Sequence, residues 1–164
     1  MTYYRRPILS TELARTTLRG AITDVQQKRL FTIEAVVLLP DHLHTIWTLP
    51  DDDSDFSTCW ALIKEAFTRR FLSAGGTESI RTPSRIRHRE RNVWQRRFWE
   101  HTIRDEDDFK RCLDYVRYNP VKHGLVERVR DYPWSSFTRY VRLGEYELEW
   151  GSEPAVDVDG AEWE

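Results

Sequence analysis

The chain has 164 residues, 40% of them hydrophobic and 13% aromatic, with a net charge of −2. This length and composition favour one domain with a real core and exclude a wholly disordered chain. No apolar run approaches the roughly 20 residues of a membrane span, and the N-terminal residues lack the apolar core of a secretory signal, so a cytoplasmic protein is expected. The two cysteines, Cys59 and Cys112, argue against a disulfide framework and a cysteine zinc site.

A short strand at Tyr3–Tyr4 and a helix are the first elements expected along the chain. Ser10 or Thr11 can cap this helix, because apolar residues recur at helical spacing between positions 14 and 25. Residues 31–39 and 42–49 are apolar and rich in β-branched residues. Since a Pro-Asp turn signal separates them, they predict a hairpin.

The second half of the chain predicts two helices and a strand around a basic loop. Apolar residues between positions 56 and 71 follow helical spacing, and residues 93–102 predict a strand. Asp105 or Asp107 can cap the last helix, which is expected to end near Asn119 because the residue before a proline disfavours helical geometry. The order of elements predicts an α+β fold in which helices cover an antiparallel sheet.

A dense group of arginines lies in the expected basic loop, residues 75–92, and in the strand expected after it. Seven arginines lie between positions 81 and 97, against Glu90 alone: Arg81, Arg85, Arg87, Arg89, Arg91, Arg96 and Arg97. Residues 144–164 hold eight acidic residues and no Lys or Arg, which leaves 19 acidic and all 25 basic residues in the first 143. We therefore expect a basic domain at 1–143, an acidic tail at 144–164 and a polyanionic partner. In the tail, Tyr146, Leu148 and Trp150 alternate with acids, which predicts a strand or an extended arm.

Two groups of residues are candidates for a metal site and for a catalytic nucleophile. His42 and His44 alternate in the second strand of the hairpin, so both imidazoles face one side, about 6.6 Å apart along the strand, and can bind one metal ion. Two solvent-facing polar residues are the alternative. At the end of the last helix, Tyr115 and Asn119 are four residues apart on one stripe, offset from the apolar face. Packing of Tyr115 on a neighbour is the alternative, and Tyr118 is a competing reactive tyrosine.

Together these residues resemble a known family. The segment Leu39–His44 resembles the HUH motif of single-tyrosine transposases. Trp94–Phe98 and the stretch YVRYNPVKHGLV at 115–126 resemble the downstream signature of the REP-associated tyrosine transposases, and YPWSSF at 132–137 resembles their closing segment. The resemblance covers most of the chain before the tail.

The resemblance implies a ferredoxin-like fold and a metal-dependent reaction on single-stranded DNA. It assigns metal binding to His42 and His44, completes the site with Asn119, and makes Tyr115 the nucleophile in preference to Tyr118. The cofactor is a divalent ion, Mg²⁺ or Mn²⁺, and two imidazole ligands favour Mn²⁺. A tyrosine hydroxyl, with an ordinary pKa of ~10, needs such activation. Attack on a phosphodiester then gives a 5′-phosphotyrosine and a free 3′-hydroxyl.

The implied partner is single-stranded DNA with hairpins formed by palindromic repeats, which places the protein at the nucleoid. The seven arginines would contact phosphates, and Trp94 or Phe98 could stack on a base, although a core role is favoured for both. A monomer is favoured over a dimer. Two alternatives stay open: a catalytically silent single-stranded DNA-binding protein derived from a transposase, and an RNA-binding module that needs no metal.

Overall fold

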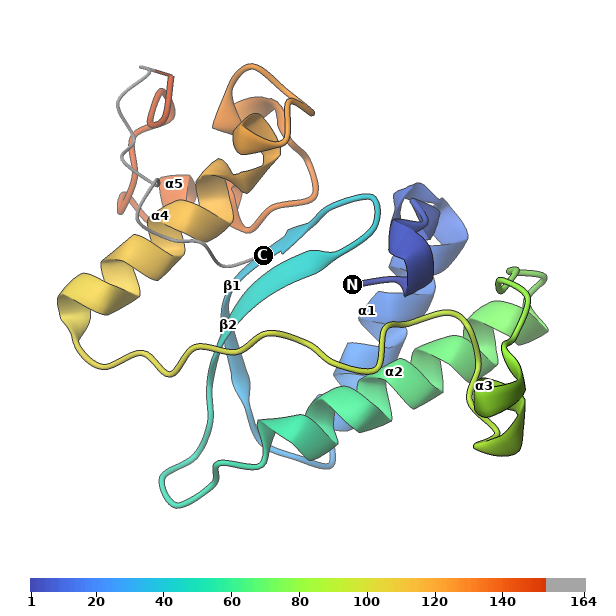
Figure 1. Ribbon diagram of the computed structural model, residues 1–164. Helices are drawn as coiled ribbons and strands as arrows, with labels where there is room; N and C mark the ends of the chain where they lie inside the picture. Colours follow the sequence, from blue (N-terminus) through green and yellow to red (C-terminus); the bar gives the residue numbers. More distant parts are fainter. Residues whose placement is uncertain (153–164) are drawn as a thin grey trace. The chain divides into compact units, whose positions relative to one another are not determined.

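The computed structural model describes residues 1–152, which form two compact units (Figure 1). The first unit contains residues 1–32, 40–42 and 48–98, and the second contains residues 33–39, 43–47 and those from 99 onward. Within the described residues, the sheet is a hairpin of two strands, β1 (Thr32–Leu38) and β2 (Leu43–Thr48). The expected α+β class and the hairpin are confirmed. No helix of residues 1–152 is long and apolar enough to cross a bilayer.

Two helices, α1 (Glu12–Gln26) and α2 (Phe56–Ser73), lie side by side and form the core of the first unit (Figure 1). Both begin where a side chain caps them: Thr11 Oγ1 accepts from the Ala14 amide at 3.2 Å, and Asp55 Oδ1 accepts from the Thr58 amide at 3.1 Å. These oxygens satisfy amide groups that have no partner inside the helix. Most residues of the expected apolar stripes are buried and the rest are partly buried, which confirms both helices.

The strands expected at Tyr3–Tyr4 and at 93–102 are wrong. Tyr3–Arg5 is a 3-10 turn (η1), followed by a second one at Ile8–Ser10 (η2), and only Thr2 and Trp94 pair as an isolated bridge. Tyr4 has φ of 56°, which no strand accommodates. Trp94 instead packs against Phe67 of α2, with ring centroids 4.9 Å apart. Residues 93–95 thus pair with residues 1–3 over one bridge, in which the Tyr3 amide donates to the Val93 carbonyl at 2.9 Å and the Gln95 amide to the Met1 carbonyl at 3.0 Å, while the Trp94 ring packs on α2.

The expected basic loop contains a short helix, α3 (Pro83–Arg87). Thr82 caps it by accepting from the Arg85 amide at 3.4 Å, and Pro83 occupies the first turn, where a missing amide proton costs nothing. Sequence periodicity could not reveal so short a helix, because five residues do not complete two turns.

In the second unit, α4 (Glu106–Lys122) packs on one face of the hairpin (Figure 1). Cys112, Leu113 and Val116 of α4 meet Ala35, Val37 and Ile46 of the strands. Asp105 caps the helix by accepting from the Asp108 amide at 2.8 Å. The apolar stripe expected on this helix is thereby confirmed as the face that packs on the sheet.

The expected end of α4 near Asn119 is wrong, because the helix continues through Pro120 to Lys122. A proline removes one backbone hydrogen bond but does not forbid a helix. The chain leaves the helix at Gly124, whose φ of +64° lies in the left-handed region that glycine adopts without strain. The additional residues bring Lys122 into the helix, on the same side as Tyr115.

The segment 133–136 extends the free edge of β1. The Leu38 amide donates to the Trp134 carbonyl at 2.9 Å, and the Ser136 amide donates to the Val36 carbonyl at 2.8 Å. The Ser136 hydroxyl accepts from the Val36 amide at 3.0 Å. The Trp-Ser-Ser part of the closing segment therefore supports the sheet that carries His44.

The last described elements are η3 (Val129–Asp131), α5 (Phe137–Arg142) and the turns at 144–152. The strand or extended arm expected around Tyr146–Trp150 is wrong for this part: Tyr146 packs its ring on Phe137 and on the buried Arg117 guanidinium, 3.8 Å from the ring centroid. The rest of the expected tail, residues 153–164, lies outside the described residues.

Candidate active site

His42 lies in the first unit, where its neighbours fix its imidazole. The side chain is buried, and its Nδ1–H donates to Asp41 Oδ1 at 2.6 Å. Arg5 Nε donates to the second carboxylate oxygen at 2.8 Å, and the Thr2 amide donates to the Asp41 carbonyl at 2.7 Å. Burial alone would raise the pKa of Asp41, but the hydrogen bonds from His42 and Arg5 outweigh it and hold that pKa below its usual value. A charged carboxylate thus keeps the proton on Nδ1 and leaves Nε2 to act as a ligand.

The turn that carries Arg5 is strained. Tyr4 and Arg5 have φ of 56° and 51°, a left-handed conformation that costs a non-glycine residue about 1–2 kcal/mol. Two successive residues of this kind are uncommon. The turn brings the guanidinium to the carboxylate behind His42, so the strain is compatible with a functional role for the contact.

His44 and Tyr115 come together in the second unit. Their rings meet edge to face, with centroids 5.3 Å apart and planes at 89°. Tyr115 is 2% exposed, so the stripe offset from the apolar face is buried as well. Lys122 Nζ lies 4.9 Å from the centre of the Tyr115 ring, which puts a positive charge beside the expected nucleophile.

Asn119 lies one helical turn after Tyr115 and is completely buried. Neither Oδ1 nor Nδ2 of its amide has a hydrogen-bond partner among residues 1–152. A buried amide without partners is costly unless a ligand completes it. The amide oxygen is therefore available to a ligand such as a cation.

The seven arginines expected to bind DNA differ in their surroundings. Arg85 is buried and donates to the carbonyls of Arg91 and Trp94, so its guanidinium supports the fold. Ion pairs within the described chain engage three more: Arg81 and Arg91 pair with Glu78, and Arg96 with Glu90. The remaining three are exposed and form no ion pair with a described residue, and we call them the exposed arginines: Arg87, Arg89 and Arg97.

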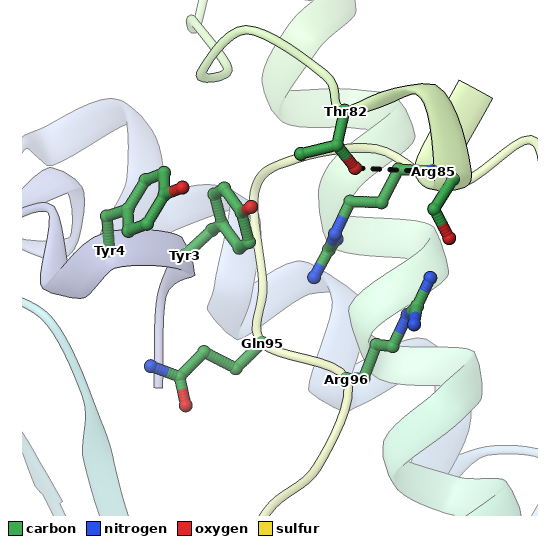
Figure 2. Close-up of a pocket in the computed structure, with 7 residues that line it drawn as sticks. Tyr3, Tyr4, Thr82, Arg85, Gln95 and Arg96 are labelled. Atoms are coloured by element: carbon green, nitrogen blue, oxygen red, sulfur yellow. Dashed lines mark hydrogen bonds between the residues drawn. The ribbon is translucent and has the colours of Figure 1, made fainter.

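A hollow of about 420 Å³ lies in the first unit, and two of the seven arginines, Arg85 and Arg96, line it. Figure 2 shows Tyr3, Arg85 and Arg96 around it, with the Arg85 guanidinium 4.3 Å from the centre of the Tyr3 ring. Thr82 and Gln95 add hydrogen-bonding groups to its wall. Aromatic faces next to guanidinium groups are the surface on which single-stranded nucleic acids stack.

Three residues of this site were missed in the sequence: Arg5, Asp41 and Lys122. Arg5 lies 36 positions from its carboxylate, and such a contact leaves no local pattern. Asp41 lies in the expected turn and in the segment that resembles the HUH motif, but neither pattern gives its carboxylate a role. Lys122 lies seven positions after Tyr115, a spacing that returns to the same side of a helix, and this signal was available once Pro120 was accepted within the helix.

Comparison with known proteins identifies a family. The family described as "Transposase IS200 like" matches residues 1–119, a range that includes all four expected site residues. The chain is 42% identical over 149 residues to the REP-associated tyrosine transposase of Escherichia coli (strain K12), covering 91% of this chain and 79% of that protein. A putative REP-associated tyrosine transposase of Haemophilus influenzae is 42% identical over 142 residues, which cover 87% of this chain and 79% of the relative.

A solved structure, that of a REP-associated tyrosine transposase bound to a REP hairpin, matches with a TM-score of 0.74 and 42% identity, covering 91% of this chain and 79% of that one. The match in sequence and the match in fold thus extend over the same large part of the chain. The chain belongs to the IS200-like transposase family.

Proposed function

We propose that this protein cleaves and rejoins single-stranded DNA that carries a hairpin, through a covalent 5′-phosphotyrosine on Tyr115. The observation that carries the proposal is the contact between the rings of Tyr115 and His44, at 5.3 Å, on the helix that also bears Asn119. The relative whose solved structure holds a REP hairpin supports the choice of DNA. His42, His44 and Asn119 would hold the metal ion, in agreement with the donor set and with the buried amide of Asn119.

The roles of the side chains follow from their chemistry. When bound, a divalent cation supplies Lewis-acid stabilisation of the charge that develops on the scissile phosphate. Tyr115 Oη loses its proton and attacks phosphorus in line, so that a bond from phosphorus to the phenolic oxygen forms and the bond to the 3′ oxygen breaks. The 3′ oxygen takes up a proton and leaves as a hydroxyl. Rejoining runs the same step backwards with another 3′-hydroxyl.

Two further groups support this step. Lys122 provides positive charge at the Tyr115 ring, where the phenolate and the scissile phosphate are negative. Asp41 orients His42 so that Nε2 is the ligand atom. Because the bond energy is kept in the phosphotyrosine, we propose that no nucleotide cofactor takes part.

DNA binding is assigned to the exposed arginines and to the hollow at Tyr3 and Arg96. We propose that the exposed arginines contact phosphates, because they are not engaged in ion pairs with described residues. The Tyr3 ring offers a stacking face to an unpaired nucleotide, and Arg96, which pairs with Glu90, adds positive charge to the wall of the hollow. Arg85 is excluded from direct contact, because it is buried against backbone carbonyls.

The test is a covalent-adduct assay on a labelled hairpin oligonucleotide with Mn²⁺, analysed on denaturing gels. We expect an adduct from the unmodified protein, none from Tyr115→Phe or His44→Ala, and an undiminished adduct from the matched control Tyr118→Phe. Adduct formation by Tyr115→Phe would exclude Tyr115 as nucleophile. Binding of the hairpin without any adduct, with or without metal, would favour the catalytically silent DNA-binding protein instead.

A further inference from the structure

A second group of metal-binding side chains lies in the second unit, on α4 and on the segment before it. His101, Asp108 and Cys112 each offer one ligand atom, and these atoms lie within 4.8 Å of one another. None of the three takes part in the proposed reaction. Asp108 and Cys112 are buried, and His101 is half-buried with its ring at the surface.

The geometry positions each donor without distortion of the helix. Asp108 and Cys112 are four residues apart on α4, and their side chains therefore lie on the same side of the helix, one turn apart. His101 Nε2 lies 3.0 Å from Asp108 Oδ1 and 2.8 Å from Oδ2. The indole of Trp99 stacks on the imidazole, with centroids 5.9 Å apart and planes at 8°, and limits rotation of the ring.

We propose that His101 Nε2, Asp108 Oδ1 and Cys112 Sγ bind a Zn²⁺ ion, with water as the fourth ligand. A thiolate, an imidazole and a carboxylate are the ligands that Zn²⁺ takes in proteins. Ligand atoms that share one tetrahedral Zn²⁺ lie about 3.3–3.7 Å apart, given bonds of about 2.0–2.3 Å. Side-chain rotations that move the ligand atoms closer together by up to about 1.5 Å therefore convert the cluster into a site.

The charges around the cluster are compatible with a cation. One carboxylate and one thiolate balance the two charges of Zn²⁺: the Cys112 sulfur gives its proton to solvent, and a neutral His101 carries its proton on Nδ1 so that Nε2 binds the ion. Arg104 and Arg111 approach the Asp108 carboxylate at 3.5 and 3.8 Å, but their side chains are 74% and 64% exposed, so both can turn toward solvent. The Arg104 amide occupies Asp108 Oδ2 at 3.0 Å, which leaves Oδ1 for the ion.

The site would tie the irregular segment 99–104 to α4. Cys112 lies one turn before Tyr115 on this helix, so the ion would restrain the helix that carries the expected nucleophile. Because a ligand that binds only the folded state stabilises it, Zn²⁺ at about 100 times its Kd should raise the melting temperature by about 5–10 °C.

Cobalt spectroscopy tests this site in isolation from the proposed active site. Co²⁺ bound to a thiolate gives a sulfur-to-metal charge-transfer band in the near ultraviolet, whereas the His42, His44 and Asn119 set contains no sulfur. We expect the full-length protein to give this band with Co²⁺ alone and to lose it when Zn²⁺ is added. The band should be abolished in Cys112→Ser and retained in the matched control Cys59→Ser.

Two further variants separate the outcomes. His42→Ala/His44→Ala should keep the band, so that loss of the proposed active-site metal and loss of this site are distinguishable. His101→Gln should weaken Co²⁺ binding at least tenfold and remove the rise in melting temperature with Zn²⁺. Because His101 is partly exposed, this variant can replace Cys112→Ser in the test if Cys112→Ser does not fold. Absence of the band in the unmodified protein, its survival in folded Cys112→Ser, or unchanged binding in His101→Gln would overturn the proposal.

Discussion

Replacement of Asp41 should weaken metal binding at His42 without a change in the ligands themselves. The Asp41 carboxylate accepts from His42 Nδ1 at 2.6 Å, and the His42 side chain is only 5% exposed, so water cannot take over this bond. A carboxylate behind a histidine ligand is worth about 10–100-fold in metal affinity. Since a tenfold change is about 1.4 kcal/mol, the range is about 1.4–2.8 kcal/mol.

Two variants of Asp41 should give the smaller and the larger loss of affinity in this range. Asp41→Asn keeps an acceptor for Nδ1–H but removes the charge, so we expect about a tenfold loss of Mn²⁺ affinity. Asp41→Ala removes the acceptor as well, so we expect up to about a hundredfold loss. Arg5→Ala should lower affinity far less, because the Arg5 side chain is half exposed and solvent screens its ion pair.

The assay is titration of the full-length protein with Mn²⁺, followed by the paramagnetic signal of the free ion, with the exposed Asp51→Asn as the matched control. Thermal melts without metal verify that each variant is folded. If Asp41→Ala binds Mn²⁺ as tightly as the unmodified protein while His42→Ala does not bind, His42 is a ligand but the carboxylate does not orient it. If His42→Ala also binds normally, the proposed ligand set is refuted.

Four further outcomes are expected. Replacement of the exposed arginines by Ala should reduce the slope of log K against log salt for single strands by about 2, at about 0.7 for each phosphate contact, whereas Arg19→Ala on α1 should leave it unchanged. Glu78→Gln should make the free energy of unfolding fall less steeply with decreasing pH. Burial raises the pKa of Glu78, but hydrogen bonds from Arg91 and the Asn92 amide outweigh it and hold that pKa below its usual value, so the charged Glu78 stabilises the fold above the ordinary glutamate pKa and this stabilisation is lost as pH falls through the lowered pKa. An unchanged melting temperature in acid would contradict this. Tyr146→Phe removes the hydroxyl that donates to Asp114 at 2.6 Å and should cost about 1–2 kcal/mol in urea unfolding. A chain that ends at Ser152 lacks five acidic residues and should bind single strands more tightly at low salt, and equal binding would remove the idea that the tail competes with DNA.

The helices and the hairpin were predictable because their signals are local. Thr11 and Asp55 cap α1 and α2 through bonds that span three residues, and the apolar stripes follow the helical repeat. The expected strand at 93–102 failed for the opposite reason. Its aromatic residues have high strand propensity, but its pairing with residues 1–3 is limited to the bridge of Thr2 and Trp94, and the rings of Trp94 and Phe98 pack on α2.

Only those residues of the candidate site that belong to recognisable sequence motifs were predictable. The His-x-His pattern and the four-residue spacing of Tyr115 and Asn119 identify three side chains that the second unit brings to one region, namely His44, Tyr115 and Asn119. The neighbours of His42 and of Tyr115 were not predictable, because Arg5 is distant from Asp41 in the sequence and Lys122 lies in an unexpected turn of helix. Arg5 reaches Asp41 only because Tyr4 and Arg5 adopt a left-handed turn, which nothing in their side chains encodes.

The central claim is that Tyr115 forms a covalent bond to DNA. The most direct measurement is to trap the adduct on a hairpin oligonucleotide with Mn²⁺, digest both protein and DNA, and locate the added mass by fragmentation of the peptide around Tyr115 and Tyr118. We predict a phosphonucleotide on Tyr115 alone, linked through the 5′ phosphate, with the released strand ending in a 3′-hydroxyl. The same mass on Tyr118, a linkage through a 3′ phosphate, or cleavage without any modified tyrosine would contradict the account.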